Sequence, residues 1–333
     1  MRISMLAHRI CCGAFLILTG NSVLAQDSTA NAAPAYPTKS VRILVGYAAG
    51  GGLDVIARIF AQKFTESMGQ TFLVENRPGA GGNIATDLTA KAAADGYTMN
   101  MAGSSHAINV SLYSKLPYDA VKDFAPVSLV AIAASVLVAH PSVPVNSLRD
   151  LIALAQSRSG QITYSSSGSG TPQHLAMELF RSMAGIQLLH VPYSGGAPAI
   201  TAALAGQVQL HSNSLPTALP HVRSGKLRAL GVTSAERSQI APEIPTVAEG
   251  GGLPGYEATG WYGLLAPAGT PAPVIRKING EIQRLLLQRD IKERLITLGF
   301  DPYRNSPEEF ARYIQRDIAK WGKVVRESGA KAD

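Results

Sequence analysis

The sequence predicts an α/β protein built as two lobes. Apolar segments typical of buried strands alternate with segments of helical spacing through residues 41–103 and again through 148–224, a pattern that indicates parallel βαβ units. Between the two series the stretch HPSVPVNS carries two prolines and is typical of a hinge or domain boundary. A chain of 333 residues is long enough to form two compact cores.

The expected elements follow one another in a regular order. Strands are expected at 41–47, 71–77, 98–103, at two places near 127–140, and at 162–167, 188–193 and 208–213. Helices are expected at 54–67, 84–94, 148–158, 172–183, 197–205 and 215–224. The chain then returns through 227–234 and 256–267 and ends in two or three helices between Pro273 and Ser328. We therefore expect one lobe from 37–138 plus 257–333 and a second lobe from 139–256.

The N-terminus has the composition of a secretory signal. Arg2 and Arg9 precede the apolar stretch ICCGAFLILTG, and Val23-Leu24-Ala25 ends in the small residue that a cleavage site needs. We expect a signal peptide at 1–25, a flexible tail at 26–36 and a periplasmic mature protein. Both cysteines lie within the signal, so a large apolar core rather than disulfides must stabilise the mature chain.

The charge pattern excludes a typical nucleic-acid binder. The formal net charge of +7 includes two arginines of the signal, and the remaining basic residues are scattered without a Lys/Arg run or an aromatic-interleaved patch. A mildly positive surface weakly favours an anionic small ligand.

Two lobes joined twice enclose a cleft, and ligands of open α/β sheets bind outside the carboxyl ends of the strands. The loops expected there are 48–53, 78–83, 104–106, 165–171, 194–196 and 212–214. They are rich in Gly, Ser, Thr and Asn, which offer backbone N–H groups and hydroxyls, and several of them open helices whose N-termini attract anions. This composition indicates a binding cleft.

The glycine-rich segments lack the motifs of common enzymes. Neither GGGLDV at 50–55 nor GAGGNI at 79–84 ends in the last glycine of a dinucleotide fingerprint. Gly-x-Ser-x-Gly, a Walker A run and His-Glu-x-x-His are also absent. We expect no enzymatic activity, no cofactor and no metal. The alternative is an exported enzyme acting on small acids, which needs a titrating group near the cleft.

The mature chain resembles the periplasmic solute receptors of tripartite tricarboxylate transporters, often called Bug receptors. The resemblance runs from about residue 36 to 327 and rests on YPTKSVRILVGYAAGGGLD, ENRPGAGGNIATD, ADGYTM, HVPYSGGAPA, ALPHVRSGKLRALGVTSAERS, IPTVAEGG and GLLAPAGTP, in that order. It implies a type II periplasmic-binding-protein fold that closes on a small carboxylate and delivers it to a membrane permease. We expect a monomer. A receptor that signals to a sensor kinase would use the same cleft.

The resemblance also implies two seats for carboxylate groups. One is the loop after the first strand, matched here by Ala48, Ala49, Gly50 and Gly51; the other is a Gly-Thr pair at a helix N-terminus, matched by Gly170 and Thr171. The N–H and hydroxyl of Thr171 are expected to reach one ligand oxygen. Asp54 is expected to be the N-cap or a first-turn acid of the helix rather than a catalytic acid.

Further candidate ligand residues flank these loops: Tyr47, Asn83, Ser104, His106, Ser167, Tyr193 and Asn213. Helix capping by Asn83, loop-internal bonding by Ser104 and His106, and wall packing by the two tyrosines are the alternatives. Asn213 stands where many relatives have an acid, and it keeps hydrogen-bonding capacity without the charge. We expect it either to disfavour ligands with an amino group or only to support its loop.

Overall fold

The computed structural model describes residues 36–193 and 196–332, so the expected signal peptide at 1–25 and residues 26–35 of the expected tail lie outside the described residues. The folded unit begins at Tyr36. Although the prediction assigned Tyr36 to the tail, its side chain is buried, and its hydroxyl donates a hydrogen bond to the carbonyl of Gly96 at 2.6 Å. Its ring also packs against that of Tyr97.

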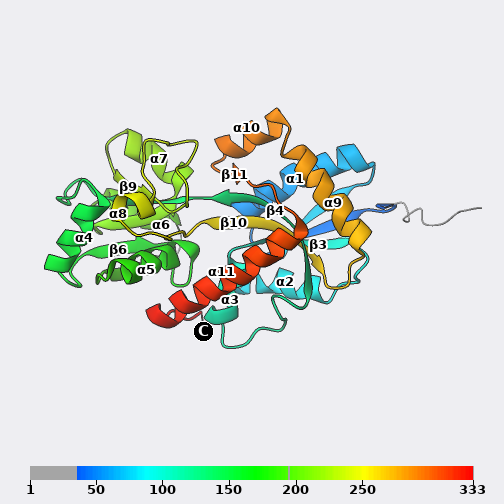
Figure 1. The fold of residues 1–333 in the computed structure, drawn as a ribbon, viewed down its shortest axis with the longest axis horizontal. Coiled ribbons are helices and arrows are strands. Elements are labelled where there is room, and N and C mark those ends of the chain that lie inside the picture. Colours follow the sequence, from blue (N-terminus) through cyan, green and yellow to red (C-terminus); the bar gives the residue numbers. More distant parts are fainter. Residues whose placement is uncertain (1–35, 194–195, 333) are drawn as a thin grey trace, which may run out of the picture. The chain divides into compact units, whose positions relative to one another are not determined.

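The first sheet has six strands in the order β11-β4-β10-β3-β1-β2 (Figure 1). The strands β1 (Val41–Val45), β2 (Phe72–Asn76) and β3 (Thr98–Gly103) are parallel, as the sequence pattern indicates. β10 (Gly260–Pro267) is antiparallel to both β3 and β4 (Phe124–Ala133), and the short β11 (Asp301–Pro302) pairs with the outer edge of β4. The sheet is therefore mixed. Its antiparallel strand β10 enters the sheet after the chain has returned from the second lobe.

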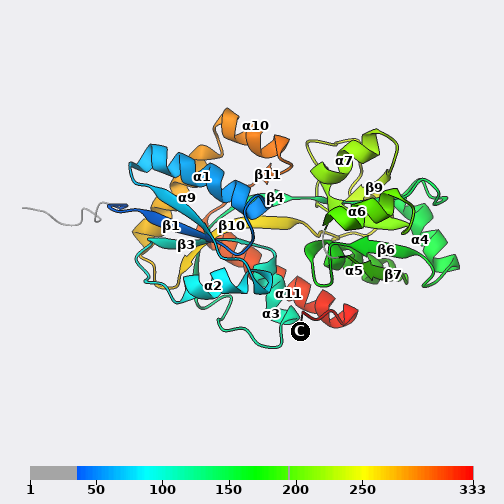
Figure 2. The same ribbon diagram turned by 180° about the vertical axis from the view of Figure 1, so that it is seen from behind.

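Helices cover both faces of this sheet. α1 (Gly52–Met68), α9 (Ala272–Leu285) and α10 (Arg289–Thr297) share one apolar core with β1 and β3. In α1 the buried Ile56, Phe60 and Phe64 recur every four residues, which places them on one side of the helix. The turn η1 (Ala80–Gly82), α2 (Asn83–Ala90) and α11 (Pro307–Ser328) lie on the opposite side of the sheet (Figure 2).

The second sheet has five strands in the order β7-β6-β8-β5-β9. These are β5 (Ser135–Ala139), β6 (Thr163–Ser166), β7 (Leu189–Pro192), β8 (Leu210–Ser214) and β9 (Arg228–Val232). α4 (Leu148–Ser157), α5 (Pro172–Ala184) and α8 (Val247–Gly251) share one core, whereas α6 (Gly196–Leu204) and α7 (Leu215–Arg223) contribute to another.

The chain passes between the sheets at two places. The first is Ala134, which lies between β4 and β5, and the second is the segment 233–259 between β9 and β10. The expected boundary at residue 138 placed most of β5 in the first lobe, but β5 pairs antiparallel with β8 and β9 of the second sheet. An apolar run does not encode its pairing partner, so the sequence pattern could not assign β5 to a sheet.

One helix that the sequence analysis does not expect, α3 (Ser105–Leu112), lies beside α11. Ile108 and Leu112 of α3, together with Trp321 and Val325 of α11, belong to the same core as Phe180 of α5. The terminal helix therefore packs against both lobes. None of the helices in the described part of the chain is long and apolar enough to cross a membrane.

Candidate ligand-binding cleft

A cavity of about 250 Å³ lies where the two sheets meet. Its walls come from the loops after β1 and β3, from the first turn of α5 and from the end of β8. Its floor comes from Ala134 with the adjoining ends of β4 and β5, and from the start of β10. The described lining residues are Tyr47, Gly51, Gly52, Leu53, Gly103, Ser104, Ser105, Ala133, Ala134, Ser135, Pro172, Gln173, Ser214, Gly260, Trp261 and Tyr262. We refer to this cavity as the cleft.

Four helices begin at the cleft. Gly51, Ser104 and Ser214 are the N-caps of α1, α3 and α7, and Pro172 and Gln173 are the first two residues of α5. The first N–H groups of a helix have no intrahelical partner, and the helix dipole adds partial positive charge at that end. The convergence of these helix ends makes the cleft favourable for an anion.

Asp54 anchors the loop after β1 through hydrogen bonds. Gly50, which has a φ of +86°, donates its N–H to Asp54 Oδ2 at 2.9 Å. The same carboxylate pairs with Arg58 at 2.9 Å and accepts a hydrogen bond from Asn76. Burial opposes ionisation, but these partners together keep the pKa of Asp54 below its usual value. Of the two structural roles expected of Asp54, that of a first-turn acid is confirmed, whereas the N-cap of α1 is Gly51.

The floor of the cleft is fixed by contacts between the first lobe and the returning strand. Ser104 Oγ accepts a hydrogen bond from the N–H of Trp261 at 2.9 Å, which leaves its own hydrogen available to the cleft. A Cβ added to Gly52 would lie 3.0 Å from the hydroxyl of Tyr262, so glycine permits this close approach. Burial raises the pKa of Tyr262 to about 12, and the phenol is therefore neutral at physiological pH.

The loop after β6 uses its hydrogen-bond donors internally. The N–H and the hydroxyl of Thr171 both donate to the carbonyl of Gly168, at 3.4 and 2.7 Å. The same hydroxyl accepts from the N–H of His174 and so caps α5. Gly170 donates its N–H to His174 Nδ1 at 3.0 Å. Contrary to expectation, both donors of Thr171 are occupied in this structure.

The structure brings only part of the expected ligand set to the cleft. Tyr47, Gly51 and Ser104 line it. Ala48, Ala49 and Gly50 are exposed on the same loop as Gly51. Ser167 does not line the cleft, but its hydroxyl donates a hydrogen bond to the side chain of Gln173, which does. Tyr193 is half-buried against the core around α6 and α7. The expected loop at 194–196 lies outside the described residues except for Gly196.

Two expected residues lie in the interior instead. Asn83 Oδ1 accepts hydrogen bonds from Asn109 at 2.7 Å and from the hydroxyl of Tyr118 at 2.6 Å, and the N-cap of α2 is Gly82 rather than Asn83. His106 places its Nε2 2.8 Å from the carbonyl of Ala120, within an aromatic cluster. Burial lowers the pKa of His106 to about 4. Both side chains point away from the cleft because they start the buried faces of their helices.

Asn213 lies at the edge of the cleft, next to Ser214. Its Oδ1 accepts a hydrogen bond from the N–H of Ser214 at 2.7 Å. Its Nδ2 is buried and has no hydrogen-bond partner among the described residues. The side chain therefore supports its loop and also keeps one donor unused.

The sequence reasoning missed the strand ends beside the two crossings as the floor of the cleft. Ala133 to Ser135 and Gly260 to Tyr262 line the cleft, as do Pro172 and Gln173. A chain that passes twice between lobes must run across the space between them, so the two predicted crossings were the available signal. No Lys, Arg, His, Asp or Glu occurs among the described lining residues, and nowhere in the described chain do three or more His, Cys, Asp or Glu gather to hold a metal ion.

A family model described as the tripartite tricarboxylate transporter family receptor matches residues 56–330. The chain belongs to this receptor family. The receptor is 38% identical over 301 residues to Protein BugT of Bordetella pertussis, a match that covers 90% of this chain and 92% of the relative. It is 36% identical over 320 residues to a protein encoded in the tcbD-tcbE intergenic region of Pseudomonas sp. (strain P51), covering 96% and 94% of the two chains.

Solved structures of similar sequence share the receptor's fold. R. palustris Rpa4515 with adipate aligns at a TM-score of 0.76 and 36% identity, covering 89% of this chain and 99% of that one. MatC from Rhodopseudomonas palustris with bound malate aligns at a TM-score of 0.72 and 33% identity, covering 87% and 100%. The predicted α/β fold, with two lobes and a cleft between them, is confirmed.

Proposed function

We propose that this receptor captures a small carboxylate in the cleft, within the periplasm, and delivers it to a tripartite tricarboxylate-type membrane transporter. The observation that carries the proposal is the convergence of four helix N-termini on a cavity whose described lining has no ionisable group other than two phenols. A carboxylate gains from the partial positive charge there and from first-turn N–H groups of α1 and α3. The ends of α5 and α7 contribute mainly through the dipole, because α5 begins with Pro172 and the first N–H of α7 donates to the carbonyl of Ala134. A cation would find no carboxylate to offset the loss of its water.

The size of the cleft supports a small ligand. Its volume of about 250 Å³ lies below the roughly 300–1,000 Å³ of pockets for drug-sized molecules. The adipate and malate named for the two similar structures are acids of this size class. We infer a di- or tricarboxylate, or an aromatic carboxylate, as the ligand class.

The enzymatic alternative finds little chemical support near the cleft. Asp54 is tied to Arg58 and to Gly50 beneath the loop. His174 accepts a hydrogen bond from Gly170, and burial, followed by the nearby His190, lowers its pKa to about 4. These groups hold loops in place and do not face the cavity. A receptor without turnover is the function that this arrangement favours.

Thermal-shift measurements on the mature protein test the proposal. The panel contains adipate, malate, succinate, an aromatic carboxylate and, as a control of opposite charge, a diamine of similar length. We expect stabilisation by at least one carboxylate, worth about 2.7 kcal/mol at a hundred times its Kd, and none by the diamine. Product analysis on the same samples should show unchanged ligand. Stabilisation by the diamine alone, or turnover of an acid, would contradict the proposal.

The periplasmic part of the proposal has its own test. Mass spectrometry of the protein secreted from its host should show an N-terminus near Gln26. An intact or lipidated N-terminus would contradict export by a cleavable signal.

A further inference from the structure

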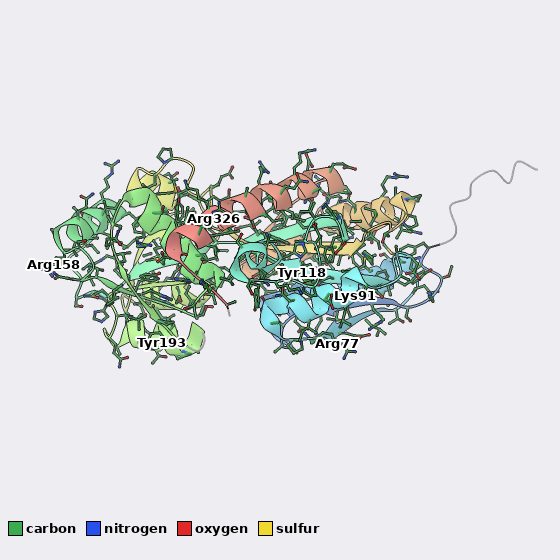
Figure 3. All side chains as sticks on the ribbon, turned by 90° about the horizontal axis from the view of Figure 1, so that it is seen from below. Arg77, Lys91, Tyr118, Arg158, Tyr193 and Arg326 are labelled. Atoms are coloured by element: carbon green, nitrogen blue, oxygen red, sulfur yellow. The ribbon has the colours of Figure 1, made fainter. Side chains whose placement is uncertain are left out.

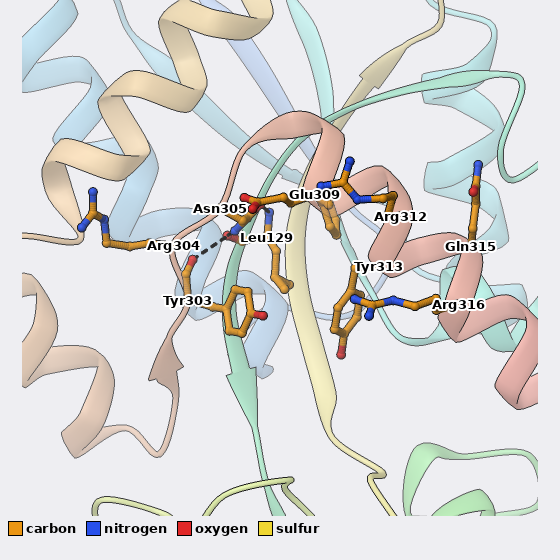
Figure 4. A pocket seen from close by; sticks show the side chains of 10 residues that line it. Leu129, Tyr303, Arg304, Asn305, Glu309, Arg312, Tyr313, Gln315 and Arg316 are labelled. Atoms are coloured by element: carbon orange, nitrogen blue, oxygen red, sulfur yellow. Dashed lines mark hydrogen bonds between the residues drawn. The ribbon is translucent and has the colours of Figure 1, made fainter. Parts of the chain in front are cut away.

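Two cavities larger than the cleft lie along α11. Their volumes are about 480 and 640 Å³, and they share Tyr303, Tyr313 and Arg316 as lining residues. Because they share these side chains, we treat them as one feature, the α11 groove. Its outer end is lined by Arg304, Arg312 and Arg316 together with the two tyrosines (Figure 4). None of these five residues lines the cleft.

Positive charge dominates only at the outer end of the groove, because the inner end is lined by Glu236, Glu257, Asp301 and Asp317 beside Arg237 and Lys320. Arg304, Arg312 and Arg316 are all exposed, and none of the ion pairs found in residues 36–193 and 196–332 involves them. Two carboxylates lie at this end. Glu309 accepts a hydrogen bond from the N–H of Ser306 in the capping box of α11. The pKa of Glu308 is lowered by hydrogen bonds at the start of the helix and, to a smaller extent, by the charge of Arg312. The guanidinium groups therefore keep their donors free for an external partner.

Two aromatic side chains lie beside these arginines. The rings of Tyr303 and Tyr313 are 6.5 Å apart, and Tyr303 is 39% exposed. The hydroxyl of Tyr313 is buried and has no hydrogen-bond partner among the described residues. Arg and Tyr are the residue types most enriched in protein interfaces, because each combines contact area with directed polar groups. A site for a small inorganic anion needs only the arginines, so the tyrosines favour a larger partner with apolar groups.

The inner end of the groove reaches both lobes. It is lined by Ile132 of β4, by Glu257 next to β10, and by Ser234 to Arg237, which follow β9 of the second sheet. Ala133, which follows Ile132, and Gly260, three residues after Glu257, line the cleft. A change in the angle between the lobes must therefore alter the inner end of the groove.

We propose that the outer end of the α11 groove is a docking surface for an acidic segment of a protein partner. The proposal extends the proposed function, since a receptor that delivers its ligand has to meet a second protein. Carboxylates of the segment bind Arg304, Arg312 and Arg316, as guanidinium groups do in paired geometry. The tyrosines supply the apolar contact, and the inner end reports the position of the lobes to the bound segment.

The test uses the full mature protein and a fluorescently labelled octaglutamate peptide as the probe. Anisotropy is measured at low salt for wild type, for Arg312→Gln/Arg316→Gln, and for the matched control Arg149→Gln/Arg158→Gln. Both pairs of arginines are exposed on helices or their ends, without ion-pair partners among the described residues, and Arg158 lies on the second lobe (Figure 3). Both variants lose two positive charges, and glutamine keeps the helix propensity.

We expect the Arg312/Arg316 variant to bind the peptide about fivefold to thirtyfold more weakly than wild type, and the control variant to bind it within about twofold. An equal loss in both variants would show attraction by net charge alone and would overturn the proposal. So would undetectable binding to wild type, or complete displacement of the peptide by inorganic phosphate of equal ionic strength. The thermal shift with carboxylates is measured in parallel. If no carboxylate stabilises the protein, the proposed function is contradicted, whereas the proposal for the groove is judged by peptide binding alone.

Discussion

The loops after β1 and after β6 hold corresponding places in the two lobes, but they treat their hydrogen-bond donors differently. In the first lobe Asp54 anchors the loop from below, and Ala48 to Gly51 stay exposed. In the second lobe the N–H and the hydroxyl of Thr171 both donate to the carbonyl of Gly168. We propose that the first loop can receive an anion with only the Gly50 N–H already bonded, to Asp54, whereas the second loop must exchange internal bonds for ligand bonds. We expect that exchange to accompany closure of the lobes.

The largest difference between the loops should appear on acidification. His174 holds the second loop by accepting the N–H of Gly170 at Nδ1, and protonation turns that nitrogen into a donor. Burial lowers the pKa of His174 from 6.5 to about 4, so the unfolded chain binds more protons between these values. This stabilisation is therefore complete above pH 6.5 and is lost as the pH falls towards 4, at about 1.4 kcal/mol per pH unit and up to about 3 kcal/mol in total.

The first loop should resist the same change, because the pKa of Asp54 is lowered. Its stabilisation is complete above the usual carboxyl pKa and is lost only as the pH falls from that value towards the lowered one. Urea unfolding of wild type and of His174→Gln from pH 7 to 4 checks this. The variant should show the smaller loss of unfolding free energy. Parallel pH profiles for the two proteins would exclude His174 as the sensitive group.

A smaller contrast concerns one glycine in each loop. Gly170 has a φ of +74°, and an added Cβ would lie 2.7 Å from Leu112 Cδ2, whereas Gly50 has a φ of +86° and open space around it. Gly170→Ala should lower the unfolding free energy by about 2–3 kcal/mol through strain and overpacking. Gly50→Ala, the matched control, should cost about 1 kcal/mol from the backbone alone. Chemical denaturation measures both, and equal costs would show that the contact with Leu112 is soft.

Thr171→Val tests whether the Thr171 hydroxyl exchanges its hydrogen bond within the loop for one to the ligand. Removal of the hydroxyl should weaken binding of the best carboxylate by about 1.5 kcal/mol, roughly tenfold. It should also lower the unfolding free energy by about 1 kcal/mol, because the hydroxyl caps α5. Calorimetry and denaturation separate the two effects. A loss of stability with unchanged affinity would mean that Thr171 serves only its own loop.

The smallest expected effect belongs to the edge of the cleft. Asn213→Asp places a negative charge next to Ser214 and should weaken binding of a succinate-like acid by about 1 kcal/mol. An aspartate-like ligand should bind the variant relatively better, since its ammonium gains a partner. Competition between the two ligands on both proteins gives the ratio. If the ratio of the two affinities is the same for wild type and variant, Asn213 does not select between these ligands.

The sequence predicted those elements whose apolar pattern is strong and local. Ile56, Phe60 and Phe64 mark α1 clearly, and the role of Asp54 followed from its place in the first turn. α3 was missed because SHAINVSL contains several weak helix formers, and its stability comes from packing against α11. The inward direction of His106 and the pairing of β5 depend on contacts far away in the chain. Such contacts have no local signature.

The position of α11 has a consequence for how the molecule is made. Trp321, Val324 and Val325 complete a core whose other members lie between residues 107 and 258. That core therefore waits for the last turns of the chain to leave the ribosome, since its contacts span long sequence distances. The export that we propose for this chain requires it to be unfolded if it is threaded through the membrane. A late-closing core keeps it in that threadable state for longer.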